Sequence, residues 1–276
     1  MRTFVFFLIL MSAHLRAQVT YDESLEAART IGTWLSKSTG HYDFLSATPV
    51  GPKRAGKKFF IRGFPDMQTA SDYGVSYMQV PRDSDVTTAY ETLGFDTSNM
   101  SRTIELSRFH LAMSFANKHD FTFSYLSSID GIKGWGLGYK RVLFHYRYFY
   151  VSHRAQYGRA TLADYFDNIN VTNDLSMSLY LRLFDIYAGV KHSFGSAQFE
   201  APNAALELPR VYYSTQINEL DYFYGAWVAT SVNSRLALQV NQFGRELAIT
   251  GKFSLWFDSI LPTANNWFRD PRYIKQ

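Results

Sequence analysis

The sequence predicts an all-β protein, a closed antiparallel transmembrane β-barrel of 10–12 strands preceded by a short N-terminal amphipathic helix. Three observations predict this fold. Apolar and polar residues alternate in a series of segments after residue 102, which is typical of strands with one apolar face. These segments are about 9–12 residues long, close to the roughly 9–11 residues that a tilted strand needs to cross a bilayer. A signal for export precedes them.

The export signal is a cleavable signal peptide over residues 1–17. Arg2 supplies a positive start, and the apolar run FVFFLILMSA follows at residues 4–13. The run is too short for a membrane-spanning helix, which needs about 20 residues. Cleavage is expected after Ala17, although Leu15 is not the small residue preferred at that position. The alternative is a buried N-terminal strand or helix.

Residues 18–56 are expected to form a helix and a linker, placed in the periplasm or as a plug in the barrel lumen. The segment DESLEAARTIGTWLSK (22–37) has acidic residues near its start and Lys37 near its end, which suits the helix dipole. Its apolar face is expected to comprise Leu25, Ala28, Ile31 and Leu35, with Trp34 beside them. A helix lying on the membrane surface remains an alternative.

Residues 57–258 are assigned to the barrel and 259–276 to a polar C-terminal tail. Ten strands are expected from 102 to 257, and twelve if FFIRGF (59–64) and YGVSYMQV (73–80) join them. Asp130-Gly131 predicts a hairpin. The apolar residues change phase in the segment 134–153, which predicts a turn or bulge near residues 139–141. Long polar loops are expected at 156–173 and 196–205.

Alternation by itself does not distinguish a soluble sandwich from a barrel in lipid. The segment LSMSLYLRLF (175–184) illustrates the choice, because its leucine row could face either a protein core or lipid. Strand length, the abundance of Leu, Phe and Tyr in the apolar rows, and the export signal favour lipid. An open sheet edge is not tolerated in lipid, so the sheet must then close.

The chain resembles bacterial outer-membrane β-barrel proteins as a broad class. The resemblance covers residues 1–17 and about 102–257, and it rests on the signal peptide, the absence of Cys and segments such as LSMSLYLRLF and ELAITGKFSLWF (246–257). It implies a Gram-negative outer membrane, contact with outer-membrane lipid and insertion by the barrel-assembly machinery. Many such proteins end on an aromatic residue that closes the last strand. Here Phe257 would do so, but 19 residues follow it.

The polar rows supply the candidate functional residues. The lumen-lining basic candidates are Arg108, Arg147, Arg182, Lys191, Arg235 and Lys252, and the polar candidates are His110, Ser176, Ser178 and Tyr180. Basic groups in a narrow pore favour small anionic solutes. Alternatively the lumen is plugged, and these cations pair with carboxylates such as Asp22, Glu23 and Glu26 of the N-terminal helix.

Other chemistries find little support. The chain has no Cys, and its formal net charge of +4 is dispersed, so neither cysteine chemistry nor nucleic-acid binding is expected. His110 and Ser114 are four residues apart on one strand face, too far for a direct hydrogen bond. Asp164, Asp167 and Asp174 lack the spacing of a calcium loop. We therefore expect no catalytic residues, metal or cofactor.

The leading functional hypothesis is an outer-membrane barrel that acts as a small pore or a membrane-structural protein, with anion preference if the lumen is open. An outer-membrane lipid-modifying enzyme is the second hypothesis. A soluble exported β-protein that binds a ligand is the third. The sequence identifies neither the solute nor the oligomeric state.

Overall fold

The computed structural model describes the barrel wall, parts of the N-terminal region and one further helix. The described residues are 23, 25–36, 39, 46–48, 60–61, 64–65, 68–79, 85–92, 103–115, 118–128, 131–162, 166–181, 183–203, 208–230, 234–243 and 246–257. The predicted signal peptide and C-terminal tail lie outside these ranges.

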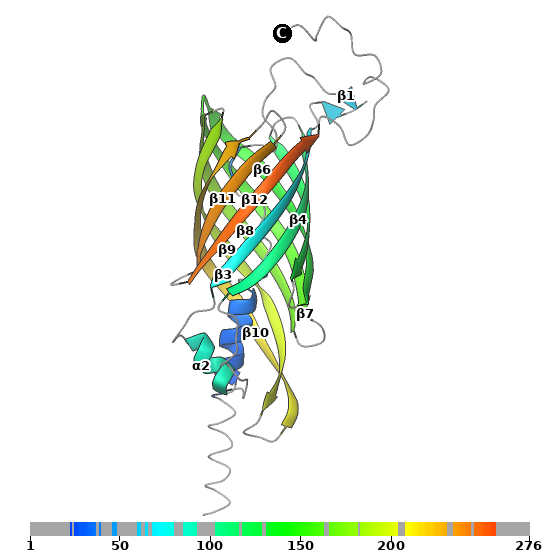
Figure 1. Ribbon diagram of the computed structural model, residues 1–276, viewed down its shortest axis with the longest axis vertical. Helices are drawn as coiled ribbons and strands as arrows, with labels where there is room; N and C mark the ends of the chain where they lie inside the picture. The colour runs from blue at the N-terminus through cyan, green and yellow to red at the C-terminus, as the bar shows by residue number, and fades with distance from the viewer. Residues whose placement is uncertain are drawn as a thin grey trace, which may run out of the picture.

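Ten antiparallel strands form a closed barrel (Figure 1). They are β3 (Gln68–Gln79), β4 (Thr103–Phe115), β5 (His119–Ser128), β6 (Ile132–Tyr146), β7 (Phe149–Leu162), β8 (Phe166–Tyr180), β9 (Phe184–Asn203), β10 (Leu208–Ala229), β11 (Ser234–Phe243) and β12 (Glu246–Phe257). Each strand pairs with the next along the chain, and β12 pairs with β3 to close the ring. The barrel total of ten lies within the predicted range of 10–12, but residues 102–257 supply nine strands, β4–β12, where ten were expected, and β3 is the tenth.

Of the two early candidate strands, one belongs to the barrel and the other does not. YGVSYMQV lies largely within β3, a barrel strand. FFIRGF instead contributes β1 (Phe60–Ile61) and β2 (Phe64–Pro65), which pair only with each other. These two short strands lie outside the barrel, near the end of β12 (Figure 1).

Several predicted connections are wrong. The expected loop at 156–173 is mostly occupied by β7 and β8, and the expected loop at 196–205 belongs largely to β9. Polar residues such as Asp167, Ser196 and Gln198 lie on the outward face of these segments, which hides the alternation of apolar and polar residues. The phase change in β6 comes from a register shift between Val142 and Phe144, a few residues later than predicted. The Asp130-Gly131 hairpin is confirmed, since Gly131 has a φ of 85° directly before β6.

The outer wall is apolar. In β8 the leucine row faces outward, with Leu175, Met177 and Leu179 46%, 53% and 44% exposed, whereas Ser176 and Ser178 are buried. The same alternation recurs around the ring, for example at Phe109, Leu111 and Met113 of β4. Exposed apolar rows on every side of a closed sheet have no protein partner in this chain, so they are suited to lipid. The fold is a transmembrane β-barrel.

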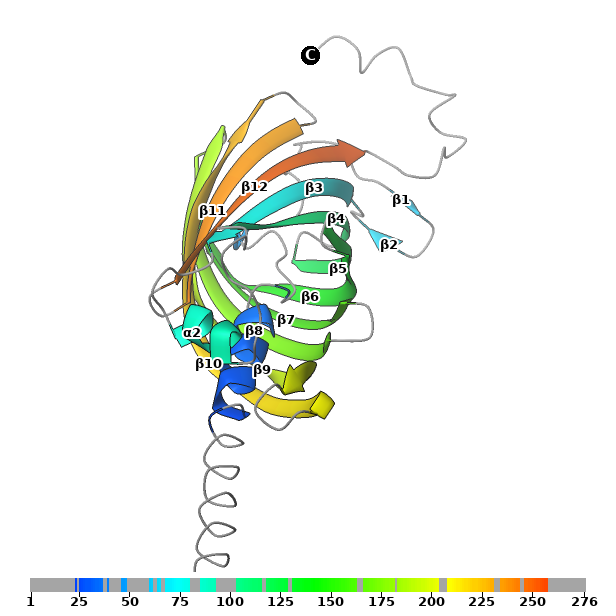
Figure 2. The same cartoon turned by 60° about the horizontal axis from the view of Figure 1, so that its bottom comes forward.

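The two ends of the barrel differ. At one end, here called the turn end, short connections join successive strands; they span residues 116–118, 147–148, 181–183 and 230–233. The opposite end, here called the far end, carries the connection 80–102 with helix α2 (Asp85–Thr92) and the long hairpin of β9 and β10. Figure 2 shows α2 and the N-terminal helix side by side at this far end.

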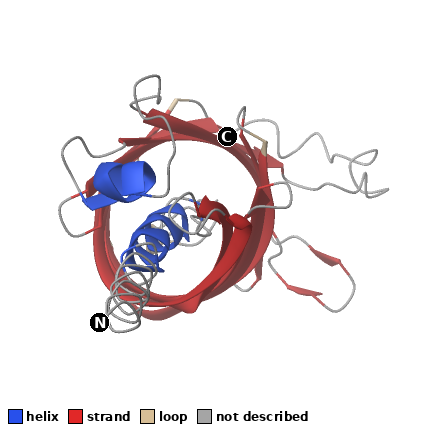
Figure 3. Cartoon of the chain, turned by 90° about the horizontal axis from the view of Figure 1, so that it is seen from below, coloured by secondary structure: helices blue, strands red, loops and turns tan. Residues whose placement is uncertain are grey.

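The predicted N-terminal helix is confirmed at residues 25–36. Ala28, Ile31, Trp34 and Leu35 are all buried, so the predicted apolar face is the packed face. Seen along the barrel from the far end, the helix lies within the ring of strands (Figure 3). No helix in the described part of the chain is long and apolar enough to span a bilayer.

Candidate functional site: the occupied lumen

A belt of charged side chains runs around part of the inner wall. In the strand register, Ser114 of β4 pairs with Asp120 of β5, and the same row continues through the five following strands. The belt comprises Asp120, Lys140, Arg154, Asp174, Lys191 and Asp221. Antiparallel neighbours on one face lie close enough to interact, so the register itself brings these charges together.

The belt is internally neutralised. Lys140 Nζ lies 2.7 Å from Asp120 Oδ2, Arg154 Nε lies 3.1 Å from Asp174 Oδ2, and Lys191 Nζ lies 3.8 Å from Asp221 Oδ2. All six side chains are at most 4% exposed. Removing one partner of such a buried pair typically costs about 3–5 kcal/mol, because the other charge stays desolvated. The belt therefore connects six strands through ion pairs, and because its charges balance it exerts little net electrostatic field on a solute.

A short stretch of the N-terminal region occupies the lumen. Ser46, Ala47 and Thr48 are all buried, far from the chain's surface. The Ser46 hydroxyl donates a hydrogen bond to Asp185 of β9, and the Thr48 hydroxyl donates to the same carboxylate at 3.0 Å. The Ala47 amide donates to the Ser178 hydroxyl of β8 at 2.8 Å. These contacts attach the stretch to the inner wall of two adjacent strands.

Lys140 connects this stretch to the charged belt. Its ammonium donates to the Ser46 carbonyl at 3.2 Å and to the Thr48 carbonyl at 2.6 Å, in addition to its ion pair with Asp120. An ammonium has three donors, and these three acceptors use all of them. The segment is thus bound on two sides of the lumen, by β6 through Lys140 and by β8 and β9 through Ser178 and Asp185.

A second attachment lies near the far end. Ser36 donates a hydrogen bond to Asn168 Oδ1 of β8, and Asn168 Nδ2 donates to Thr39 Oγ1 at 3.3 Å. Asn168 and Ser178 are ten residues apart on one strand, which corresponds to about 33 Å along it. Thr39 and Ser46–Thr48 are therefore attached to the inner wall at two levels that lie far apart along the barrel.

Strand β6 presents no side chain between these two levels. Gly134, Gly136 and Gly138 all point inward, followed on the same face by Lys140. Gly134 shares a register row with Ala160 and Asn168, the residue that binds Thr39. A glycine stripe therefore extends from the level of Thr39 to the level of Ser46. Between these levels β6 therefore contributes only backbone to the inner wall.

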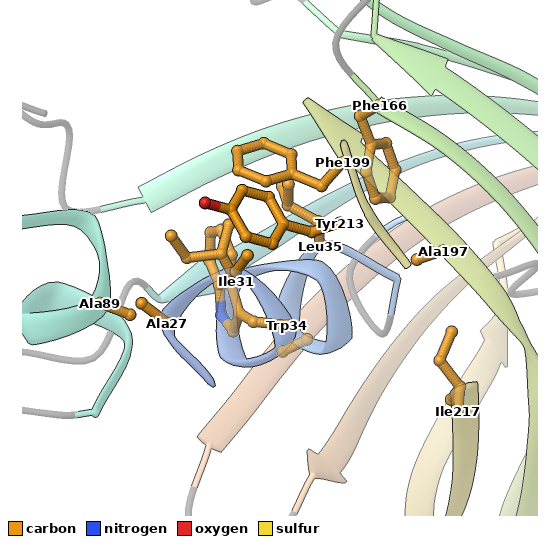
Figure 4. Close-up of a cluster of buried hydrophobic side chains, with 12 residues drawn as sticks. Ala27, Ile31, Trp34, Leu35, Ala89, Phe166, Ala197, Phe199, Tyr213 and Ile217 are labelled. Carbon is orange, nitrogen blue, oxygen red and sulfur yellow. The ribbon is translucent and has the colours of Figure 1, made fainter. Parts of the chain in front are cut away.

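The N-terminal helix packs into the far mouth of the barrel. Ile31, Trp34 and Leu35 belong to one buried apolar cluster with residues of the strand ends (Figure 4). The strand residues of this cluster are Phe166, Ala197, Phe199, Tyr213, Ile217 and Ala248. Ala89 of α2 joins it beside Ala27 (Figure 4). The apolar face of the helix thus supplies a core that the polar lumen lacks.

Most of the predicted lumen residues do line the lumen. Arg108, Lys191, Arg235, Lys252, His110, Ser176 and Ser178 are all buried on the inner wall, and Tyr180 is half-buried near Trp227. Arg235 stacks over the Trp227 ring at 4.4 Å, and the Trp227 indole donates to Asp185 Oδ2 at 3.0 Å. Arg182 lies outside the described residues.

Arg147 is a correction. It occupies the exposed turn between β6 and β7, with a φ of 52°, and its guanidinium lies 5.3 Å from the Tyr146 ring centroid. Strand β6 ends at Tyr146, so Arg147 lies in the turn and does not follow the alternation of the strand. Glu26 of the N-terminal helix is a second correction: it is 72% exposed and pairs with Arg29 at 3.5 Å, away from the lumen cations. Glu23 is also exposed, and Asp22 lies outside the described residues.

The sequence reasoning missed six of the ten buried lumen charges among the described residues. Lys140 and Arg154 were not recognised as lumen residues, nor were Asp120, Asp174, Asp185 and Asp221. Asp174 lies directly after a segment that was read as a loop, which hid its alternation. Among the described residues, six buried basic side chains and four buried carboxylates face inward. The lumen is therefore closer to neutral than the sequence indicated.

Catalytic or metal-binding groupings are not evident in the described part of the chain. No group of three or more His, Asp or Glu side chains there could hold a metal ion. Asp167 and Asp174, considered earlier for calcium, point to opposite faces of β8: Asp167 pairs with Arg159 on the outer wall at 2.7 Å.

Comparison with known proteins assigns no family. No protein-family model and no curated protein matches the chain. Similar solved structures include the KdgM porin, at 8% identity over 68% of this chain and 99% of that one, with a TM-score of 0.39. The translocator domain of the autotransporter NalP from Neisseria meningitidis matches at 8% identity, 89% and 99% coverage and a TM-score of 0.39. The outer-membrane protease OmpT from Escherichia coli matches at 8%, 70% and 95%, with a TM-score of 0.38.

Proposed function

We propose that this protein is an outer-membrane β-barrel that is closed at rest by its own N-terminal region. The observation that carries the proposal is the binding of Ser46–Thr48 to three strands through Asp185, Ser178 and Lys140. An open pore requires a continuous water path, whereas this segment and the N-terminal helix occupy the path. The protein then acts as a membrane-structural barrel, and it conducts solutes only when the segment leaves the lumen.

We propose that the protein is located in the outer membrane, because its barrel has an apolar outer wall and its sequence has a predicted signal peptide. The apolar outer rows span about the length expected for a bilayer-crossing strand, roughly 9–11 residues. The sequence begins with a predicted export signal. Sedimentation of the protein with the outer-membrane fraction, and heat-dependent migration on a gel, would support this location; a soluble monomer without detergent would contradict it.

The orientation follows from the two ends. Bacterial barrels have short periplasmic turns and longer extracellular connections. By this rule the turn end faces the periplasm, and the far end, with α2 and the N-terminal helix, faces the exterior. The N-terminal region then enters the lumen from the cell surface and continues toward the periplasmic end.

The closed-lumen proposal is tested with a reversible cross-link. The hydroxyl oxygens of Ser46 and Ser178 are 3.3 Å apart, and the chain has no native Cys. The double variant Ser46→Cys, Ser178→Cys is expected to form a disulfide in native membranes and to give no steady conductance in a planar bilayer. Each single-Cys variant is the matched control. Absence of the cross-link, or an open-pore conductance in the cross-linked protein, would overturn the proposal.

A further inference from the structure

A row of basic side chains crosses the outer wall of β5, β6 and β7. His119 pairs in register with Arg141, and Arg141 pairs with His153. All three face outward: Arg141 is exposed, and both histidines are half-buried. The exposed Lys118 precedes His119 in the turn between β4 and β5. The row is therefore located on the membrane-facing side of the barrel, level with a turn at the turn end.

Carboxylates are missing from the surrounding sequence. Between Asp130 and Asp164 the chain contains no Asp or Glu. Asp120, which follows His119, points into the lumen and pairs with Lys140. Among the described residues, neither Arg141 nor His153 forms a hydrogen bond or ion pair through its side chain. An outward arginine on the edge of an apolar wall is unfavourable unless an anion accompanies it.

An apolar groove begins directly beside this row. It has a volume of about 610 Å³, and its outward-facing walls are formed by Leu111, Met113, Phe121, Phe123, Leu137 and Tyr157. The small outward-facing residue Ala155 lies along it, which explains why the surface is hollowed there. Tyr139 connects the two features, because it lines the groove and its hydroxyl lies 2.7 Å from His119 Nδ1.

We propose that this surface is a binding site for an anionic phospholipid of the leaflet at the turn end. The phosphate binds Arg141 between His119 and His153, and an acyl chain lies in the groove. A guanidinium binds phosphate through two parallel hydrogen bonds, which an exposed arginine beside two histidines can provide. Arg141 and Leu137 are about 13 Å apart along β6, so the headgroup and the chain lie in the order that a lipid requires.

Basic residues next to a bilayer surface attract anionic lipids in general, but here the charges are combined with a shaped apolar groove. Lys133 provides the contrast. It is also an exposed outward cation of β6, but it lies near the far end, in register with Thr161. The proposal predicts that Arg141 contributes to lipid selectivity and that Lys133 does not.

The experiment measures lipids retained by the full chain in native mass spectrometry. The detergent-solubilised protein is incubated with dioleoyl phosphatidylglycerol or with dioleoyl phosphatidylcholine, which have the same acyl chains. We expect at least a fivefold preference for phosphatidylglycerol, lost in Arg141→Gln and preserved in Lys133→Gln. Ala155→Leu, which fills the groove, should reduce the retention of phosphatidylglycerol at least threefold while the charges remain.

Three results would overturn the proposal. Equal retention of the two lipids by the wild-type protein would show that no headgroup selection exists. An unchanged preference in Arg141→Gln would place the site elsewhere. Tighter, Arg141-dependent retention of lipid A than of phosphatidylglycerol would assign the surface to a lipid of the opposite leaflet. Heat-dependent migration of each variant verifies that the barrel is folded, and the outcome does not depend on whether the lumen is closed.

Discussion

Ser46 and Asp185 are 139 positions apart in the chain, yet they are hydrogen-bonded in the middle of the protein's interior. The contact joins a residue that precedes the barrel to the start of one of its longest strands, β9. Because Thr48 and Trp227 donate to the same carboxylate, Asp185 ties together the enclosed segment, β9 and β10.

Asp185→Ala is expected to loosen the enclosed segment. Hydrogen bonds to a charged group contribute about 1.5–3 kcal/mol each, so losing these acceptors should shift the segment toward release. Labelling of an Ala47→Cys variant by a water-soluble maleimide should become at least about tenfold faster in this background, which corresponds to about 1.4 kcal/mol. Asp167→Ala, on the outer wall, is the control. Equal labelling rates in both backgrounds would contradict the prediction.

Arg154→Ala should destabilise the barrel strongly. Arg154 and Asp174 are both at most 1% exposed, and removing the guanidinium leaves a buried carboxylate without its cation. We expect a loss of about 3–5 kcal/mol in the free energy of unfolding. Arg159→Ala breaks an outward pair whose side chains are 47% and 36% exposed, and should cost less than about 1 kcal/mol. Urea unfolding in detergent measures both, and similar losses would refute the assignment of the belt as a structural element.

Two glycines provide a test of packing inside the wall. A Cβ at Gly189 would lie 2.4 Å from the Phe223 ring and from the Leu175 carbonyl oxygen, whereas a Cβ at Gly251 would meet nothing within 4 Å. Gly189→Ala should therefore cost about 1–3 kcal/mol, as overpacking does. Gly251→Ala should change stability by about 0.5 kcal/mol at most. The temperature at which the folded gel band disappears compares the two variants.

The proposed orientation makes a prediction about labelling of intact cells. Arg29 lies on the exposed side of the N-terminal helix at the far end, and Arg147 lies in a turn at the opposite end. In a chain without native Cys, Arg29→Cys should react with a membrane-impermeant maleimide on intact cells, and Arg147→Cys should react only after the outer membrane is permeabilised. The reverse labelling pattern would show that the barrel has the opposite orientation in the membrane.

The local sequence pattern correctly predicted the features that depend only on neighbouring residues in the chain. The outward leucine row of β8 and the apolar face of the helix at Ile31 and Leu35 are where alternation and helical periodicity placed them. The same reasoning failed at Asp174, because a strand that is polar on both faces looks like a loop. It also failed at Arg147, because β6 ends at Tyr146 and the alternation of faces does not continue into the turn.

By itself the sequence determined that this chain forms a closed barrel with an apolar exterior, since alternation over long segments specifies which face meets lipid. Only the tertiary structure decided what fills the interior. The neutral charged belt depends on the register of six strands, and the position of Ser46–Thr48 depends on contacts with residues 92 to 139 positions away. Register and long-range contacts are set by closure of the whole sheet, so no local stretch of sequence contains them.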